Sequence, residues 1–96
     1  MLFHTMLEYV DTSEAGEKRS LQLFSKWQPG PGRFLSFYGF ADGTGGVAIV
    51  EAESAADLAR TVFPWTPWLK FTVKPILPIQ EAAAVSAEAI AFRDSK

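Results

Sequence analysis

Residues 33–51 read RFLSFYGFADGTGGVAIVE, two apolar runs on either side of a glycine-rich centre. The first run, 33–40, holds four aromatic residues in eight, a composition typical of a β-strand. The second run, 47–51, predicts a strand that is apolar on both faces. The centre, 41–46, is a turn cluster in which glycine supplies positive φ angles. We therefore expect two antiparallel strands joined as a hairpin.

The segments before this hairpin predict a strand and a helix. Residues 2–10 are short, apolar and bounded by polar residues, as expected of a strand. Residues 14–27 repeat apolar side chains at helical spacing, after cap oxygens at 11–13 and before the Pro-Gly run 29–32. The strand carries apolar residues on both faces, with Leu2 and Met6 on one and Phe3 and Leu7 on the other.

The segments after the hairpin repeat the same order. Ser54 is a good N-cap for an amphipathic helix over 55–63, which Pro64 ends. Residues 68–76 alternate as a strand, and residues 80–93 form an alanine-rich helix with a weak apolar stripe. Along the last strand Leu69, Phe71 and Val73 face one way, and Trp68, Lys70, Thr72 and Lys74 face the other. Lysines on a strand are typical of a protected sheet edge.

The order β-α-β-β-α-β with a final helix predicts an α+β, ferredoxin-like fold, built as one domain over residues 1–96. Right-handed crossovers place both main helices on one face of a four-stranded antiparallel sheet, with the first and third strands central. Both central strands are apolar on both faces, so the second face also needs a cover. We expect a second copy of the chain in a C2 homodimer, and the alternative is that the C-terminal helix covers this face.

Composition excludes several function classes. The chain has 96 residues, 48% of them hydrophobic, a net charge of −2 and no cysteine. It is too apolar for intrinsic disorder, and no basic stripe favours nucleic acid. Disulfides, iron–sulfur clusters and cysteine nucleophiles are excluded. No signal peptide and no apolar run of about 20 residues is visible, so we expect a soluble cytoplasmic protein that does not contact membranes.

Two stretches carry most of a family resemblance, and the helix end at 24–29 and the N-terminal strand agree with it. Residues 40–51, FADGTGGVAIVE, and residues 63–77, FPWTPWLKFTVKPIL, resemble the two signatures of a small bacterial family catalogued as domain of unknown function 3303. The resemblance extends over nearly the whole chain. It implies a fold like the dimeric α/β barrels, which are paired ferredoxin-like domains. That superfamily includes cofactor-independent monooxygenases, isomerases, heme-degrading enzymes and binding proteins, so the resemblance implies no particular activity.

Few residues offer chemistry. His4 is the single histidine and a candidate general base, while Tyr38 and Glu51 are further catalytic candidates. Each also has a structural interpretation, as a partly buried histidine, a rim tyrosine and a solvated strand-end acid. Trp27, Trp65 and Trp68 are candidate walls of a ligand pocket, or else fill the ends of the sheet. One histidine without cysteine does not make a transition-metal site, and no cofactor is expected.

Three function hypotheses follow. The first is a small homodimeric protein that binds a small molecule, or assists another protein, without catalysis. The second is a cofactor-independent isomerase or monooxygenase acting on an apolar or aromatic compound, with His4, Tyr38 and a tryptophan as its chemistry. The third, heme binding, would use His4 as the single axial ligand.

Overall fold

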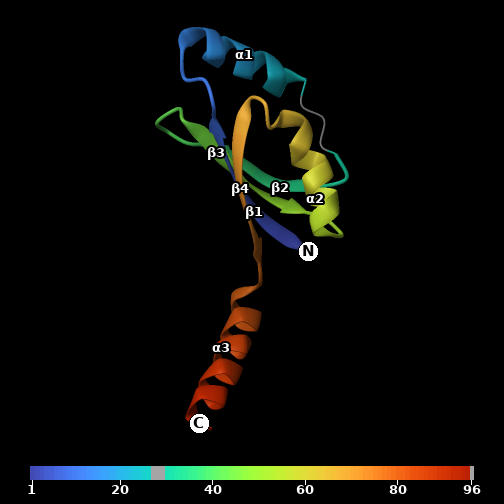
Figure 1. The fold of residues 1–96 in the computed structure, drawn as a ribbon, viewed down its shortest axis with the longest axis vertical. Helices are drawn as coiled ribbons and strands as arrows, with labels where there is room; N and C mark the ends of the chain where they lie inside the picture. Colours follow the sequence, from blue (N-terminus) through green and yellow to red (C-terminus); the bar gives the residue numbers. More distant parts are fainter. Residues whose placement is uncertain (27–29, 96) are drawn as a thin grey trace.

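The computed structural model describes residues 1–26 and 30–95, apart from the side chain of Phe24. Its elements follow in the order β1 (Leu2–Tyr9), α1 (Glu14–Ser25), β2 (Arg33–Gly39), β3 (Gly45–Glu51), α2 (Ala55–Val62), a 3-10 turn η1 (Phe63–Trp65), β4 (Leu69–Ile76) and α3 (Ile79–Asp94). The fold is α+β in the ferredoxin-like order, and the predicted succession of elements is confirmed (Figure 1).

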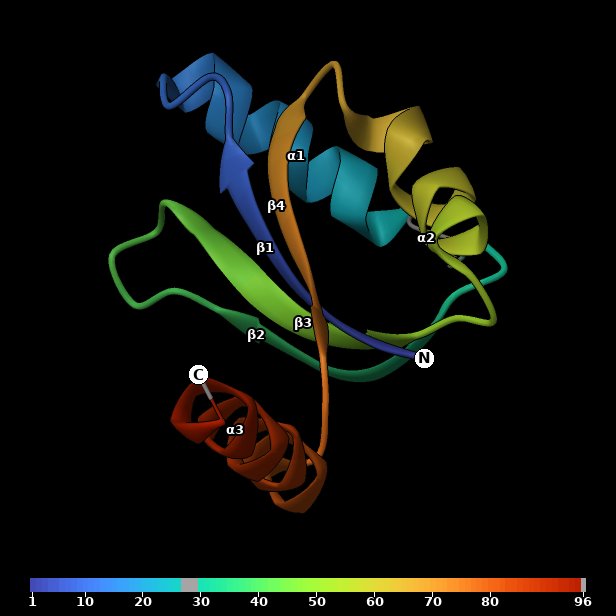
Figure 2. The ribbon, with the colours of Figure 1, turned by 60° about the horizontal axis from the view of Figure 1, so that its bottom comes forward.

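The four strands form one antiparallel sheet in the order β2-β3-β1-β4. β1 and β3 are therefore central, as predicted. Helices α1 and α2 lie on the same side of this sheet, with α1 towards one end of the strands (Figures 1 and 2). Phe3 of β1 and Val50 of β3 are buried against Leu58 and Val62 of α2. Burial of these side chains is the main stabilising contribution to the fold.

Serine side chains begin both helices of this layer. The Ser54 hydroxyl accepts the backbone N–H of Asp57 at 3.1 Å, which confirms the predicted N-cap of α2. The Ser13 hydroxyl accepts the backbone N–H of Gly16 at 3.2 Å at the start of α1. The end of the predicted first helix at residue 27 lies outside the described residues, and the helix is described to Ser25.

The other face of the sheet, which we call the open face, has no helix over it in the described part of the chain. Leu2, His4 and Met6 of β1 point there, because they alternate with the buried Phe3, Thr5 and Leu7. The strand register adds further members of the open face, which are Glu8, Arg33, Ser36, Tyr38, Val47, Ile49, Glu51, Lys70, Thr72, Lys74 and Ile76.

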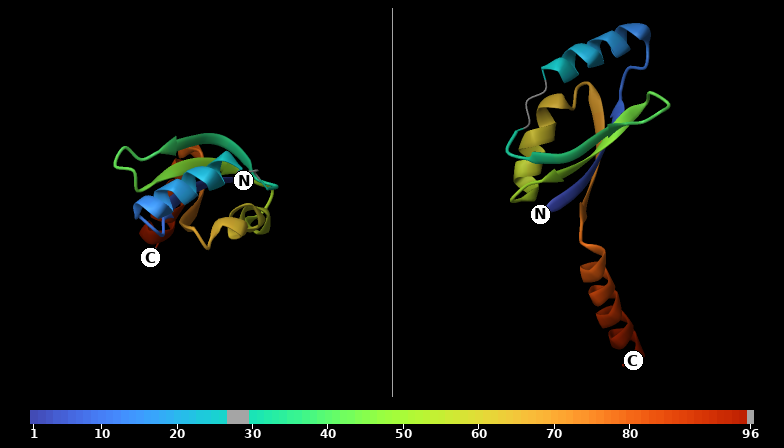
Figure 3. Two further views of the ribbon diagram at one scale, coloured as in Figure 1. Left: turned by 90° about the horizontal axis from the view of Figure 1, so that it is seen from above. Right: turned by 180° about the vertical axis from the view of Figure 1, so that it is seen from behind.

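Helix α3 does not cover the open face. It continues away from the end of β4, and none of its residues is buried (Figures 1 and 3). The molecule is consequently 58 Å long and 27 by 20 Å across, and its radius of gyration is 17.0 Å. A compact chain of this length has a radius of gyration of about 12.5 Å. The alternative in which the C-terminal helix covers the sheet is therefore wrong for this structure.

A β-bulge interrupts the alternation of faces along β2. The register shifts between Phe34, which pairs with Val50, and Ser36, which pairs with Ile49. Phe34 therefore lies on the helix-covered face, whereas simple alternation would place it beside Ser36 and Tyr38. Alternation also misplaced Trp68, which precedes β4 and turns toward α1 instead of joining the lysines of the open face.

The glycines of the β2–β3 connection serve two different purposes. Gly43 adopts a φ of 78°, so it provides the left-handed turn conformation that the sequence predicted. Gly45 instead belongs to β3, where an added Cβ would collide with the backbone oxygen of Leu7. Gly46 is close to the backbone oxygen of Tyr38 in the same way. The third strand accordingly begins two residues earlier than predicted.

Candidate functional site

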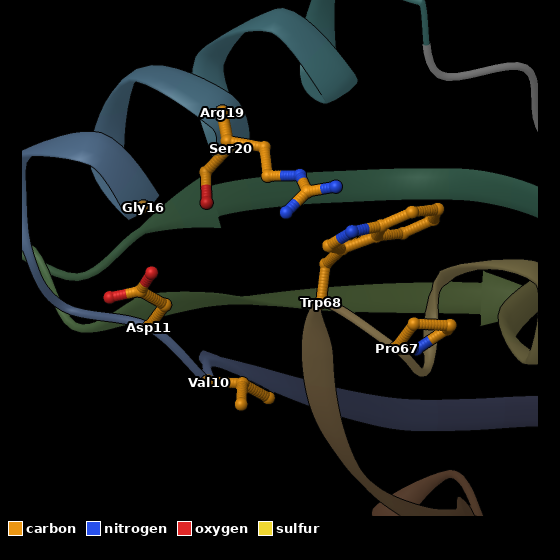
Figure 4. Close-up of a pocket in the computed structure, with 7 residues that line it drawn as sticks. All are labelled: Val10, Asp11, Gly16, Arg19, Ser20, Pro67 and Trp68. Atoms are coloured by element: carbon orange, nitrogen blue, oxygen red, sulfur yellow. The ribbon is translucent and has the colours of Figure 1, made fainter.

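A small cleft lies where the β1–α1 loop, the first turns of α1 and the corner before β4 meet (Figure 4). We call it the Trp68 cleft. Its volume is about 110 Å³, and three separate chain segments contribute its walls. Its lining residues are Val10, Asp11, Gly16, Arg19, Ser20, Pro67 and Trp68.

A cation and an indole lie together in the cleft. The guanidinium carbon of Arg19 lies 5.7 Å from the centroid of the Trp68 ring, within the range of a cation–π contact. Figure 4 shows the Arg19 side chain extending over the indole. A guanidinium carries five N–H donors in a fork geometry that suits a carboxylate. Arg19 therefore places hydrogen-bond donors for an anion beside the indole, in the wall of the cleft.

Asp11 supplies a negative charge at the other side of the cleft. Its Oδ1 accepts the backbone N–H of Ser13 at 2.9 Å. Hydrogen bonds from Ser13 are the main reason that the pKa of Asp11 lies below its ordinary value of 3.8, and the charge of Arg19 adds a smaller effect. The carboxylate therefore stays ionised at neutral pH, and the cleft presents one fixed charge of each sign.

Gly16 makes this arrangement sterically feasible. An added Cβ on Gly16 would collide with the backbone oxygen and the side chain of Asp11. The glycine lets the first turn of α1 fold back onto the loop, although it lowers helix propensity. Residues 16, 19 and 20 share one helix face by their i, i+3, i+4 spacing. That spacing is the signal that would have drawn attention to Arg19 and Ser20, which the sequence interpretation passed over.

The predicted ligand-binding tryptophans differ in their positions relative to the Trp68 cleft. Trp68 lines the cleft, and Trp65 lies half-buried in η1 without lining it. Trp27 lies outside the described residues.

The predicted catalytic residues are not gathered into one site. His4 lies on the open face, opposite Ile49 on β3 and Lys74 on β4. Tyr38 lies on β2, so that β3 separates it from the strand of His4, and it is 68% exposed. Glu51 is exposed at the strand end, where its Oε1 accepts a 3.0 Å hydrogen bond from Arg33. All three lie on the open face, on three different strands, and none of them lines the Trp68 cleft.

A second hollow lies between α2 and the edge strand β4. Its volume is about 330 Å³, and none of its lining side chains carries a charge or a hydrogen-bonding group. The lining residues are Phe3, Ala55, Leu58, Ala59, Val62, Phe63, Val73 and Pro75. This hollow has shape but no polar group to orient a ligand. In the described part of the chain, no three histidine or carboxylate side chains gather as metal ligands.

The family model described as "Domain of unknown function (DUF3303)" matches residues 1–90. The chain belongs to the DUF3303 family. The matched range contains both sequence signatures, the whole sheet and the Trp68 cleft, and it ends within α3. No curated protein matches the chain. Over the described residues, no helix of this DUF3303 protein is long and apolar enough to cross a bilayer.

Proposed function

We propose that this protein is a homodimeric small-molecule-binding protein without catalysis of its own, which takes a small planar carboxylate in the Trp68 cleft. The Arg19 guanidinium carries the proposal, because it lies beside the Trp68 ring in the cleft and can donate two hydrogen bonds to one carboxylate. The carboxylate of the ligand would accept from the guanidinium edge. The Ser20 side chain and the apolar wall of Val10 and Pro67 would surround the rest of the ligand.

The charges of the cleft limit what it accepts. Asp11 faces the same space as Arg19 and repels a second negative charge. A monoanion whose far end is neutral or positive therefore suits the cleft better than a dicarboxylate. The small volume favours a compact molecule over a nucleotide or a heme.

Binding without catalysis is favoured over the isomerase or monooxygenase alternative by the placement of the titratable groups. His4, Tyr38 and Glu51 lie on separate strands, and none of them lines the Trp68 cleft. A general base must reach the proton that it abstracts to within hydrogen-bond distance. Heme ligation by His4 would place the heme on the open face, which the proposed dimer buries.

The proposed dimer packs two open faces together, in the manner of a dimeric α/β barrel. Its support is the apolar centre of that face, formed by Leu2, Met6, Val47 and Ile49 on the two central strands. Exposed apolar patches of this kind on a sheet mark protein–protein contacts. A C2 axis lying between the sheets would place the apolar patch of one protomer against the same patch of its partner.

The binding proposal is tested by titrating the ¹⁵N-labelled protein with benzoate, acetate and the uncharged benzamide. We expect benzoate to shift the amide signals of residues 10–20, Thr66 and Trp68, and Arg19→Gln to weaken its binding about tenfold or more. Arg60→Gln is the matched control, because Arg60 pairs with Asp57 on α2 and does not line the cleft. Equal benzoate affinity in the wild type and Arg19→Gln would overturn the proposal.

A further inference from the structure

We propose that α3 is an exchanged arm, which packs against the edge strand β2 of a second copy of this chain. The inference rests on the face-to-face dimer proposed above and adds to it a defined contact between the protomers. Two surfaces of the same molecule, the arm and the strand, are apolar and uncovered in the described chain.

The arm has apolar side chains on more than one side. Val85, Ile90 and Phe92 are each at least half exposed. One stripe at helical spacing contains Ile79, Ala83 and Ile90. Val85 and Phe92 lie seven residues apart on another stripe. A helix that is apolar on several sides is normally buried between surfaces. Lying flat on its own sheet would cover only one of the two stripes.

The edge strand β2 lacks the usual protection against pairing. Leu35 and Phe37 are 48% and 41% exposed, and no charged residue or proline lies between Arg33 and Gly39. The opposite edge, β4, carries two exposed lysines and Pro75. Long apolar edges are normally covered by a helix or a loop, whereas lysine and proline protect an edge directly. The unprotected edge is therefore the one that needs a cover.

The dimensions of the arm and the strand agree. Sixteen helical residues span about 24 Å, and seven strand residues span about 23 Å. The charged side chains of α3 are Glu81, Glu88, Arg93 and Asp94, and the last two stand at its C-terminal end.

The area that the dimer needs favours the same arrangement. Two four-stranded sheets packed face to face share a flat contact footprint of about 900 Å², counted over both protomers, at the usual strand spacing. Two arms, each with a footprint of about 240 Å² on the partner and as much on its own surface, add about 960 Å². The arms would thus roughly double the contact area, and a larger buried area favours a stable dimer.

Paramagnetic broadening in a mixed dimer tests the contact directly, because the chain contains no cysteine of its own. A nitroxide is attached to Leu35→Cys in an unlabelled copy, which is mixed with ¹⁵N-labelled wild type. We expect broadening of the α3 amides in the labelled chain, which itself carries no nitroxide. A second label at Arg33→Cys reports on the same edge if the change at Leu35 disturbs the contact.

Ile90→Glu and Ala84→Glu provide matched variants of the full chain. They place the same charge on the same helix, Ile90 on an apolar stripe and Ala84 on the side of Gln80 and Glu88. We expect Ile90→Glu to raise the dimer dissociation constant about tenfold or more, and Ala84→Glu to leave it nearly unchanged. If the chain is a dimer, but neither α3 broadening nor this difference is found, the arm proposal is wrong and the dimer stands. A monomer at all concentrations would refute both.

Discussion

Two buried threonines place the same hydroxyl group in opposite situations. Thr61 on α2 accepts the backbone N–H of Gly32 at 2.9 Å and donates to the carbonyl of Asp57 at 2.9 Å. Gly32 is a glycine because a Cβ there would lie 2.8 Å from the same hydroxyl. The Thr5 hydroxyl on β1 is equally buried but has no hydrogen-bond partner within the described chain. An identical substitution should therefore have opposite effects at the two positions.

Thr61→Val removes the acceptor of a buried N–H group and should lower the free energy of unfolding by about 1–3 kcal/mol. Thr61→Ser keeps the hydroxyl and should recover most of that loss. Urea denaturation at a fixed protein concentration measures both variants, provided that the m-value is unchanged. Equal stability of the valine and serine variants would show that the bridge from α2 to Gly32 contributes nothing.

Thr5→Val replaces a buried hydroxyl that lacks a partner by a methyl group of similar size. We expect the free energy of unfolding to rise by about 1 kcal/mol, because the desolvation cost of the hydroxyl is removed. The same urea series measures it. A marked loss of stability would mean that the hydroxyl has a bound water or other partner in solution.

At the scale of elements, the β2–β3 hairpin depends on a charged turn residue. The Thr44 hydroxyl and backbone N–H donate to Oδ1 of Asp42 at 2.7 and 3.1 Å. These hydrogen bonds lower the pKa of Asp42 below its ordinary 3.8. A lowered folded-state pKa adds stability that is fully present above 3.8 and is lost as the pH falls through the folded value.

Asp42→Asn should therefore have a lower free energy of unfolding than the wild type at pH 7. This difference in free energy should shrink as the pH falls below 3.8 and through the folded-state pKa of Asp42. Denaturant midpoints of the two proteins across this pH range measure the effect. A difference that is the same at every pH would show that the ionised form of Asp42 has no special role in the turn.

Two glycines of the same hairpin are required for different reasons, Gly43 for its backbone conformation and Gly45 because there is no room for a Cβ. Gly43→Ala should cost about 1 kcal/mol, because alanine resists the left-handed conformation but meets nothing within 4 Å. Gly45→Ala should cost more, about 2 kcal/mol or above, because its Cβ must displace the backbone of β1. Thermal or urea unfolding ranks the two variants. The reverse order would mean that β1 and β3 separate easily at this end.

Element types and their order follow from sequence periodicity, but three local placements do not. The bulge after Phe34 puts this residue on the face opposite to the one that simple alternation gives, because an inserted residue breaks the period of two. Trp68 leaves the alternation of β4, because it belongs to the corner and stacks with Arg19. The Trp68 cleft was predicted only through that tryptophan, since its other members come from a loop and a helix that meet only in the fold.

On the scale of the whole molecule, the sequence indicated a sheet with two apolar faces and too few helices to cover both. The structure agrees for the face covered by α1 and α2, and it leaves α3 apart from the open face. Sequence could not distinguish a helix that folds back from one that extends, because α3 has no single apolar side to fix its direction. Both uncovered surfaces acquire a partner in the proposed dimer.

This assembly has a thermodynamic signature that needs no structural probe. If folding and association are coupled, the midpoint of thermal unfolding rises with protein concentration, by about 3–4 °C per tenfold for a dimer of this size. Ile49→Lys places a charge at the centre of the open face and should abolish this dependence. Leu21→Lys makes the same kind of change at an exposed site on α1, and it should preserve the dependence. A midpoint independent of concentration in the wild type would contradict the coupling, because only a change in the number of particles makes unfolding depend on concentration.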